Sequence, residues 1–282
     1  MEKLSKVIVI LGMHKSGTSM VAGALEKLGV NIGNKLLGSH WSNPLGHFEN
    51  VKFVNLNERI LKEAKGSWDN PPKKEDILSL KKRFSKEIQK LVKKEEKSKI
   101  WGWKDPRTSL TIELYLPYLK NPHFFVCHRN IKAIAEELKE RNNMEIVKGE
   151  KLAKLYEKRI DEFFQKYPKS KKLDIYYEEF VSAPTIGLKK MINFLEIKPT
   201  QKQFQEALNF IRHPKDMEIL ALKMRIKELK MHIKELHDQL NYIYNLQGWK
   251  LLNKCYRIVD KVLPIGSRRR KVVEKILKWI NQ

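Results

Sequence analysis

The sequence predicts an α/β fold, a doubly wound parallel sheet flanked by helices, followed by a C-terminal helical and coiled-coil extension. Three observations predict it. Val7 to Leu11 is a continuous apolar run that leads directly into a glycine-rich loop and a helical pattern, as expected of a buried parallel strand. Further apolar runs alternate with helical patterns, which indicates a parallel sheet covered on both faces. From Ile219 onward, apolar residues repeat in heptads, the period of a coiled coil.

The loop after the first strand, "LGMHKSGTSM", keeps the glycine spacing of a Walker A phosphate loop. Gly12 and Gly17 stand where that motif requires glycine, but Thr18 follows the second glycine and the lysine comes earlier, at Lys15. Backbone amides at the start of a helix bind phosphate oxygens through oriented dipoles, and Lys15 can reach the anion from the side. We therefore expect a P-loop fold. The missing Lys-Ser/Thr pair disfavours a metal-dependent nucleotide kinase, because that pair holds Mg²⁺ on a triphosphate.

The remaining elements continue the alternation. Apolar residues at helical spacing predict helices over 18–28, 51–64, 77–96 and 151–166. Apolar runs that end in polar or charged residues predict strands within 99–108, 123–129 and 173–177, the first of them ending in a polar turn at Pro106. Two more helices are expected. One has Ile131, Ile134, Ala135 and Leu138 facing inward, and the other carries Leu188, Met191, Ile192 and Leu195. In parallel sheets ligands bind at the carboxyl ends of the strands. The polar and charged residues that follow the apolar runs of this chain lie at those ends.

Three segments are expected along the chain: a P-loop domain over 1–215, a coiled-coil helix over 216–247 and a basic amphipathic tail over 248–282. The heptad seam consists of Ile219, Leu222, Ile226, Leu229, Ile233, Leu236, Leu240 and Ile243. This pattern is typical of a parallel two-stranded coiled coil, so we expect a homodimer through 219–243. Arg225 would face Lys230 of an identical partner, at a cost of a few tenths of a kcal/mol, too little to oppose the apolar seam. The alternative is one helix folded back on its own P-loop domain.

The charge is strongly positive, with 57 Lys and Arg against 33 Asp and Glu, a formal net charge of +24. It indicates an anionic partner such as a nucleotide, a nucleic acid, an acidic glycan or a membrane surface; a lysine-rich composition without a partner is the alternative. The tail from Leu246 to Gln282 has ten Lys and Arg against two Asp and Glu, with Trp249 and Trp279 among aliphatic residues. That composition suits an anionic membrane surface. No nucleic-acid-reading motif is found, so nucleic acid is not expected as a partner.

The cysteines and the N-terminal sequence indicate the cellular compartment in which the protein is expected. Cys127 and Cys255 lie far apart and match no metal spacing, so a reducing, cytoplasmic compartment is expected, peripheral at the inner membrane surface if the tail binds lipid. The N-terminal stretch MEKLSKVIVILG is interpreted as a buried strand, not a signal peptide. No stretch approaches the roughly 18 apolar residues that span a membrane.

Five motifs in the same order resemble those of sulfotransferases that use 3′-phosphoadenosine 5′-phosphosulfate (PAPS). "GMHKSGTSM" resembles their 5′-phosphosulfate loop, and "NPLGHFEN" and "WGWKDPRT" resemble the N-P-x-G-[YH]-F-E and K-D-P-R-T elements of the bacterial, carbohydrate-type branch. "VCHRNIKAIAEEL" resembles the element that binds the 3′-phosphate, and "LDIYYEEFVSAPTIGLKKMINFL" resembles the late Y-E-x-[FL]-x-x-x-P segment. The resemblance covers roughly residues 5–200, and ordered motifs are far more specific than any one alone.

The resemblance implies an enzyme that transfers a sulfuryl group from PAPS to a hydroxyl, with a carbohydrate or polysaccharide as the expected acceptor and no metal. Lys15 would stabilise the bridging oxygen as the phosphate leaves, and Lys104 or Arg107 would hold the sulfuryl oxygens or the 5′-phosphate. Arg129, at the end of another strand, would bind the 3′-phosphate. The donor-binding residues expected on this basis are His14, Lys15, Ser16, Gly17, Thr18, Ser19, Arg107, Arg129 and Glu137.

Glu137 departs from the family pattern. Family members place a serine there, eight residues after the arginine, to bind the 3′-phosphate, whereas this sequence has a glutamate. A carboxylate beside a phosphate is repulsive unless a cation pairs with it. Three interpretations stay open: the helix register differs locally, Arg141 neutralises Glu137, or PAPS recognition is weakened.

A base must take the proton from the acceptor hydroxyl. The candidates are His40, His47, Glu49 and Asp105, of which Glu49 is favoured because it occupies the glutamate of the F-E element. His47 would point to the opposite face if the segment is extended. The alternative functions are a different P-loop nucleotide-binding protein, kinase-like, and a non-catalytic basic protein associated with membrane or glycan.

Overall fold

The structure is a computed structural model that describes residues 5–44, 46–96, 98–212 and 214–280; for residues 212, 214–221, 247 and 277–280 it describes the backbone alone. The chain divides into two compact units, Met1–Leu222 and Lys223–Gln282.

The first unit is built on a parallel sheet. Its strands are β1 (Lys6–Leu11), β2 (Ile100–Lys104), β3 (Pro122–His128) and β4 (Lys171–Tyr176), in the order β2-β1-β3-β4. All three pairings are parallel, and Val9 of β1 lies opposite Trp103 of β2 and Phe124 of β3. The predicted α/β fold with a parallel sheet is therefore confirmed.

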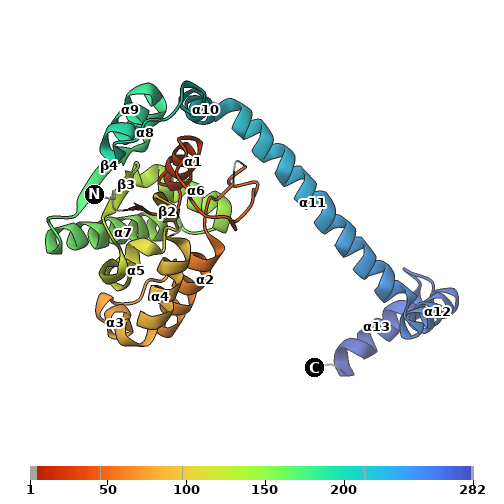
Figure 1. The fold of residues 1–282 in the computed structure, drawn as a ribbon. Coiled ribbons are helices and arrows are strands. Elements are labelled where there is room, and N and C mark those ends of the chain that lie inside the picture. Colours follow the sequence, from red (N-terminus) through yellow and green to blue (C-terminus); the bar gives the residue numbers. More distant parts are fainter. Residues whose placement is uncertain (1–4, 45, 97, 213, 281–282) are drawn as a thin grey trace. The chain divides into compact units, whose positions relative to one another are not determined.

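Helices cover both faces of the sheet, because the side chains of β1 alternate between two cores. Val7, Val9 and Leu11 pack into one core, whereas Ile8 and Ile10 pack into the other. The first core lies under α2 (Val51–Glu63), α3 (Lys74–Ser79), α4 (Lys81–Glu95), α5 (Thr108–Tyr115), α6 (Ile131–Asn142) and α7 (Ile146–Lys166). The second core lies under α1 (Thr18–Lys27), α8 (Tyr177–Ser182), α9 (Pro184–Leu195) and α10 (Gln201–Arg212), as Figure 1 shows. A short 3₁₀ turn, η1 (Leu116–Tyr118), precedes β3.

One predicted helix is divided in the structure. The segment 77–96 was expected to be continuous, but α3 ends at Ser79 and α4 begins at Lys81. Leu80 donates its N–H to the carbonyl of Ile77 at 3.1 Å, a tighter closure than an α-helical bond, and the Ser79 hydroxyl donates to the carbonyl of Asp76 at 2.7 Å. Such local bonds compete with the continuing helix and end it.

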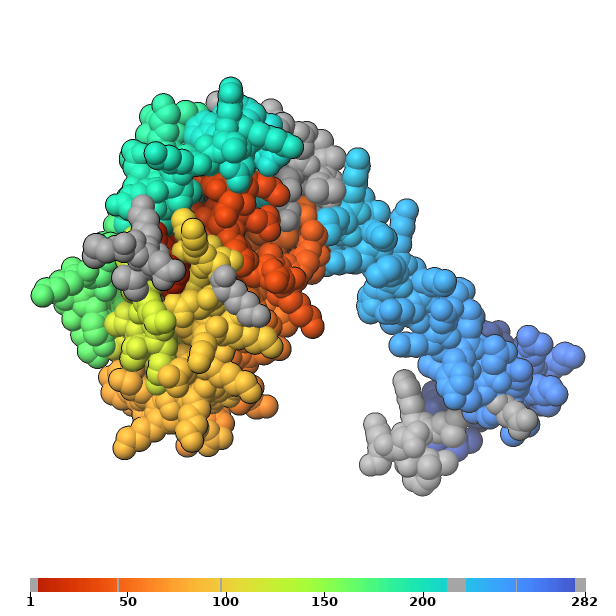
Figure 2. Space-filling view, in the orientation of Figure 1, coloured from red at the N-terminus to blue at the C-terminus, as the bar shows by residue number. Residues whose placement is uncertain are grey.

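The C-terminal elements are helical: α11 (Pro214–Asn245), α12 (Gln247–Val262) and α13 (Arg268–Ile280). Arg270 at the start of α13 forms an ion pair with Asp260 of α12. The described seam residues of α11, from Leu222 to Ile243, keep between 45% and 65% of their surface exposed, and Figure 2 shows side chains standing out along the visible face of this blue segment. The side chain of Ile219 lies outside the described residues. Among the helices that the structure describes, none has the length and hydropathy needed to cross a bilayer.

Candidate active site

The P-loop wraps around the start of α1. Gly17, which precedes the helix, has φ 91°, and a Cβ at this position would lie 2.7 Å from Tyr177 Cδ2. Lys15 also has a positive φ, 71°. Glycine tolerates this backbone conformation without a steric penalty. The loop is therefore shaped by both its backbone and Tyr177, and it leaves the N-terminus of α1 facing the space in front of the loop.

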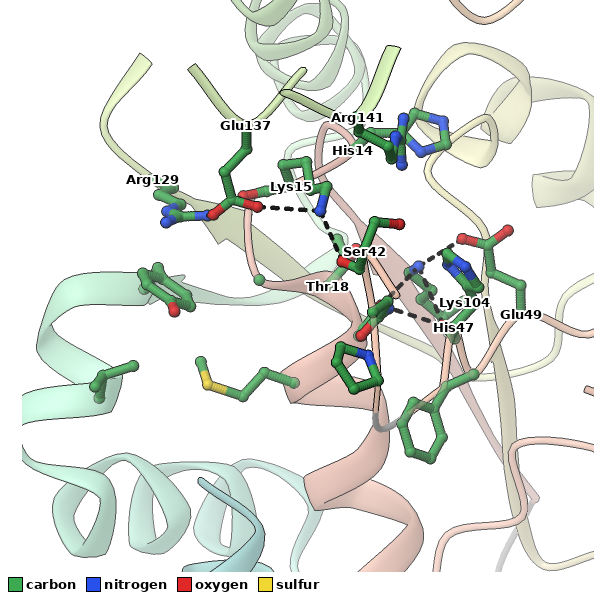
Figure 3. Close-up of a pocket in the computed structure, with 18 of the residues that line it drawn as sticks. His14, Lys15, Thr18, Ser42, His47, Glu49, Lys104, Arg129, Glu137 and Arg141 are labelled. Carbon is green, nitrogen blue, oxygen red and sulfur yellow. Dashed lines mark hydrogen bonds and ion pairs between the residues drawn. The ribbon is translucent and has the colours of Figure 1, made fainter. Parts of the chain in front are cut away.

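That space is a cavity of about 510 Å³. Seven parts of the chain line it: the P-loop with the start of α1, residues 41–44 and 47–49, Lys104 at the end of β2, Arg129 after β3, the inner side of α6, and residues of α8 and of α10. Figure 3 shows Lys15, Lys104, Arg129 and Arg141 arranged around the cavity. The predicted site at the carboxyl ends of the strands is thus a real concavity with several cations in its wall.

Lys15 points into the cavity and is held at both sides. Its Nζ donates to the carbonyl oxygen of Ser42 at 2.8 Å and lies 3.1 Å from Glu137 Oε2. Burial lowers the pKa of Lys15 from its ordinary value, and Glu137 opposes that shift. The ammonium is therefore partly desolvated, which strengthens its interaction with an anion that reaches it.

Arg129 lies beside Lys15. Its Nη1 donates to the carbonyl of Lys15 at 2.8 Å and to Glu137 Oε1 at 2.5 Å, and its guanidinium carbon lies 4.2 Å from the ring centre of Tyr177. Its Nε is buried and has no hydrogen-bond partner. The arginine is thus fixed by a carbonyl, a carboxylate and an aromatic ring.

Glu137 points into the cavity and bridges these two cations. Burial alone would raise the pKa of Glu137, but Lys15 and Arg129 outweigh it and lower the pKa below its ordinary value. Of the three interpretations left open by the sequence, none named this pair of partners. The guanidinium of Arg141, the neutralising partner considered there, lies 5.3 Å from the ring centre of Trp68.

Lys104 and Glu49 form the other polar wall. Lys104 Nζ donates to Glu49 Oε1 at 2.6 Å, to Ser19 Oγ at 3.1 Å and to the carbonyl of His47 at 3.2 Å. Glu49 and Lys104 also form an isolated parallel bridge between their backbones. This bridge fixes the predicted F-E element against the end of β2, so both charged groups face the cavity.

Arg107 and Asp105 lie behind that wall, not on the cavity surface. Arg107 Nη1 lies 2.9 Å from Asp105 Oδ1 and 3.6 Å from Glu49 Oε2, and its Nη2 lies 3.0 Å from Glu58 Oε1. Burial opposes the charged form of Arg107, but Asp105 and Glu49 raise its pKa above the ordinary value. Asp105 is fully buried and also accepts from Asn57 Nδ2 at 2.8 Å. The pair therefore orients Glu49 from behind, and Asp105 is too enclosed to meet an acceptor.

His47 and Glu49 both line the cavity. The expectation that they would face opposite sides of an extended segment does not apply, because Phe48 between them has φ 53° and breaks the alternation. Burial, followed by Lys104, lowers the pKa of His47 to about 4, so its imidazole is neutral near pH 7. His40 lies further out, with its ring centre 6.1 Å from that of His47 and its Nδ1 2.8 Å from Ser42 Oγ.

The remaining P-loop residues divide between the cavity and the loop itself. Thr18 and Ser19 line the cavity, whereas Ser16 donates its hydroxyl to the carbonyl of Met13 at 2.7 Å and holds the loop. His14 is buried against Trp68, with ring centres 4.5 Å apart, and its Nε2 has no hydrogen-bond partner. Burial, then Arg107 and Arg141, lower the pKa of His14 well below its ordinary value. A neutral imidazole with a free nitrogen therefore lines the cavity.

Sequence reasoning missed several residues of the site. Tyr177 stacks on Arg129, Ser42 accepts from Lys15, and Ser109 Oγ accepts from the N–H of Gly12 at 3.0 Å. Tyr177 could have been found, because it is the last residue of a predicted strand and so stands at a carboxyl end. Ser42 and Ser109 carried no such signal. Among the described residues there is no group of three or more His, Cys, Asp or Glu side chains placed to hold a metal ion.

Comparison with known proteins identifies a family and several solved structures that this chain resembles. The model of a sulfotransferase family matches residues 7–201, and a search of curated proteins found no match. A similar solved structure is the sulfotransferase domain of the Synechococcus PCC 7002 olefin synthase, at 14% identity over 80% of this chain and 89% of that chain, with a TM-score of 0.49. A second is the sulfotransferase domain from the curacin biosynthetic pathway, at 15% identity over 73% of this chain and 78% of that chain, with a TM-score of 0.47. A third is sulfotransferase STF9 from Mycobacterium avium, at 14% identity over 75% of this chain and 69% of that chain, with a TM-score of 0.46.

Proposed function

Because the chain belongs to the PAPS-dependent sulfotransferase family, we propose that its cavity holds PAPS and transfers the sulfuryl group to a hydroxyl of a carbohydrate or polysaccharide. The observation that carries this proposal is the convergence of Lys15, Lys104 and Arg129 on one cavity at the N-terminus of α1, with Glu49 in the same wall. Such a set suits an anionic donor on one side and a hydroxyl acceptor on the other.

The donor would be held through its phosphates. The amides at the start of α1, with the hydroxyls of Thr18 and Ser19, suit the 5′-phosphosulfate, and Arg129 suits the 3′-phosphate. The residues fit such a ligand, because the buried Nε of Arg129 lacks a partner and a ligand oxygen would satisfy this donor. The Nε2 of His14 also lacks a partner, and it donates to a ligand oxygen in the tautomer that has its proton on Nε2. A wall of cations and backbone amides matches the charge of a phosphosulfate.

The chemistry follows from these positions. The acceptor oxygen attacks the sulfur, the bond from sulfur to the bridging phosphate oxygen breaks, and the hydroxyl proton passes to Glu49. Lys15 stabilises the negative charge that develops on the leaving 5′-phosphate, and Lys104 stabilises the sulfuryl oxygens. Arg107 and Asp105 act as positioning residues, since Arg107 lies 3.6 Å from Glu49 and Asp105 holds Arg107.

The acceptor side of the cavity supports a carbohydrate. Trp41, Asn43 and Arg141 line the cavity together with His47. An aromatic face beside amide and charged groups offers both a surface for a sugar ring and hydrogen bonds for its hydroxyls. A sugar that already carries acidic groups would gain from Arg141 and from the net charge of +24.

The test of this proposal is transfer of labelled sulfuryl from PAPS to a panel of neutral and acidic oligosaccharides, with aryl alcohols for comparison. Transfer to an oligosaccharide is expected. Lys15→Ala should lower turnover by about two to three orders of magnitude, because it removes a cation from the leaving phosphate. Lys35→Ala is the matched control, since Lys35 is an exposed cation outside the cavity. Equal loss in both variants, or no transfer to any sugar, would contradict the proposal.

The C-terminal region is proposed to assemble and locate the enzyme. We divide the chain into a sulfotransferase domain over 1–215, a coiled-coil helix over 216–247 and a tail over 248–282. The exposed seam of α11 supports a parallel homodimer, because a row of half-exposed Leu and Ile at heptad spacing gains from burial against an identical row. Arg225 Nη1 lies 3.7 Å from Glu228 Oε2, which reduces the repulsion expected between Arg225 and Lys230.

The tail supports contact with an anionic membrane on the cytoplasmic side. Six apolar residues of α12 have between 43% and 65% of their surface exposed: Leu251, Leu252, Tyr256, Ile258, Val259 and Val262. At helical spacing they form one side of α12, while Lys250, Lys254, Arg257 and Lys261 form the opposite side. A helix with one apolar and one cationic side binds the interface of an anionic bilayer.

A further inference from the structure

Glu137 stands between the two cations on which the donor site depends. Its Oε2 lies 3.1 Å from Lys15 Nζ and its Oε1 lies 2.5 Å from Arg129 Nη1. Each oxygen meets a different cation, so Glu137 occupies both cations at once (Figure 3). One carboxylate faces two cations, so the group of three keeps a positive charge and still attracts an anion.

Arg129 has contacts besides Glu137 and is less exposed than Glu137. Arg129 is fixed by the carbonyl of Lys15 and the ring of Tyr177, and only 15% of its side chain is exposed, compared with 35% for Glu137. Arg141 lies one helical turn after Glu137 on α6 and lines the same cavity. Residues four apart on a helix are neighbours, so a rotation of the Glu137 side chain brings its carboxylate toward another cation.

We propose that Glu137 is a specificity-determining residue of the donor site: an internal anion that occupies Lys15 and Arg129 in the free enzyme and that the nucleotide must displace. The inference rests on the proposed function, in which those two cations hold the donor. A ligand that offers phosphates to both cations replaces Glu137, whereas a ligand that reaches only one of them does so poorly. The site thereby discriminates against simpler anions without any further contact.

The same competition acts on the product. After transfer, the adenosine 3′,5′-bisphosphate still occupies Lys15 and Arg129, and it must dissociate before the next donor binds. Glu137, tethered beside these cations at a high effective concentration, takes them back as the product leaves. Product release limits the turnover of many enzymes. Glu137 therefore lowers the affinity for PAPS and at the same time raises the rate at which the bisphosphate product dissociates.

The test compares wild type with Glu137→Gln and with Glu140→Gln as the matched control. Glu140 lies on the next turn of α6 and lines the same cavity, so both variants remove one negative charge from the same place. Calorimetry would measure the dissociation constants of adenosine 3′,5′-bisphosphate and of adenosine 5′-monophosphate. Glu137→Gln should bind the bisphosphate about tenfold more tightly than wild type, and the monophosphate should gain by a larger factor, so that the preference for the bisphosphate falls. Glu140→Gln should resemble wild type in both measurements.

Steady-state kinetics provide a second measurement. Glu137→Gln should have a lower KM for PAPS, stronger inhibition by the bisphosphate product and an unchanged or lower kcat. If Glu137→Gln is less stable than wild type, thermal unfolding with and without the bisphosphate still shows whether the variant binds it more tightly. Tighter binding gives a larger rise in melting temperature when the ligand is added. Unchanged or weaker bisphosphate binding in Glu137→Gln would overturn the inference and leave the proposed function standing. Absence of bisphosphate binding in all three proteins would overturn both.

Discussion

Lys104 Nζ lies 2.6 Å from Glu49 Oε1, and only 3% and 5% of the two side chains are exposed. A buried ion pair of this kind adds little to stability by itself, because the cost of desolvating both charges offsets their attraction. The ion pair matters here because it fixes the positions of its two groups. It holds a carboxylate, the proposed base, and a cation, the proposed stabiliser of the sulfuryl oxygens, at fixed positions in one wall.

The first prediction concerns Glu49. Glu49→Gln keeps the shape of the side chain but removes the proton acceptor, so kcat should fall by about two to four orders of magnitude while binding of the bisphosphate changes little. The control is Glu58→Gln, which removes a more exposed carboxylate from the same Arg107 and should retain activity near that of wild type. Pre-steady-state transfer from PAPS measures the effect; a Glu49→Gln enzyme with near-normal kcat would show that another group takes the proton.

The second prediction concerns stability at acid pH. The pKa of His47 is lowered to about 4 in the folded protein, compared with about 6.5 in an unfolded chain. Between pH 6.5 and pH 4 the unfolded chain binds a proton at His47 that the folded protein does not bind. The contribution of neutral His47 to the free energy of unfolding is therefore fully present above pH 6.5 and is lost as the pH falls toward 4. Melting temperatures from pH 7 to pH 4 should fall less steeply for His47→Asn than for wild type. His237→Asn, at an exposed position of α11, should follow wild type; parallel curves for all three proteins would contradict the shift.

The third prediction concerns the coiled coil. Light scattering should give a dimer for the full chain, and Leu229→Asp with Leu236→Asp should give a monomer, because charges at two seam positions oppose burial. Lys227→Asp places a similar charge outside the seam and should remain dimeric. A 1–216 truncation should also be monomeric. A monomeric full chain at micromolar concentration would remove the coiled-coil proposal.

The fourth prediction concerns the tail. The full chain should sediment with vesicles that contain about 30% phosphatidylglycerol and be released by salt, because polybasic attraction falls off within a Debye length. Leu252→Asp with Tyr256→Asp should weaken binding at least tenfold, since both positions lie on the apolar side of α12. Asn253→Asp lies outside that side and serves as the control. Equal binding to neutral vesicles, or no effect of the two substitutions, would be evidence against the membrane proposal.

The fold was largely predictable because its signals are local. β1 is a continuous run of apolar residues, and the strand, glycine loop and helix follow each other directly, so the P-loop and Lys15 could be found without any tertiary information. The resemblance to sulfotransferase motifs also placed Glu49, Lys104 and Arg129 in one site, and the structure brings all three to the same cavity.

The missed features depend on contacts between distant segments or on single backbone angles. The bridge from Glu137 to Lys15 and Arg129 joins three segments, and no spacing rule predicts which cation a carboxylate meets. The positive φ of Phe48 brings His47 and Glu49 to the same cavity, although phenylalanine rarely adopts this conformation. The break at Leu80 interrupts a pattern that is apolar at helical spacing throughout, so periodicity alone could not show it.

Calorimetry with adenosine 3′,5′-bisphosphate against ATP and ADP, with and without Mg²⁺, tests whether this cavity binds a 3′-phosphorylated sulfonucleotide. We expect sub-millimolar binding of the bisphosphate that does not depend on Mg²⁺, and much weaker binding of ATP and ADP, because Arg129 is placed for a phosphate that those nucleotides lack. Tight, Mg²⁺-dependent binding of ATP without binding of the bisphosphate would contradict this expectation.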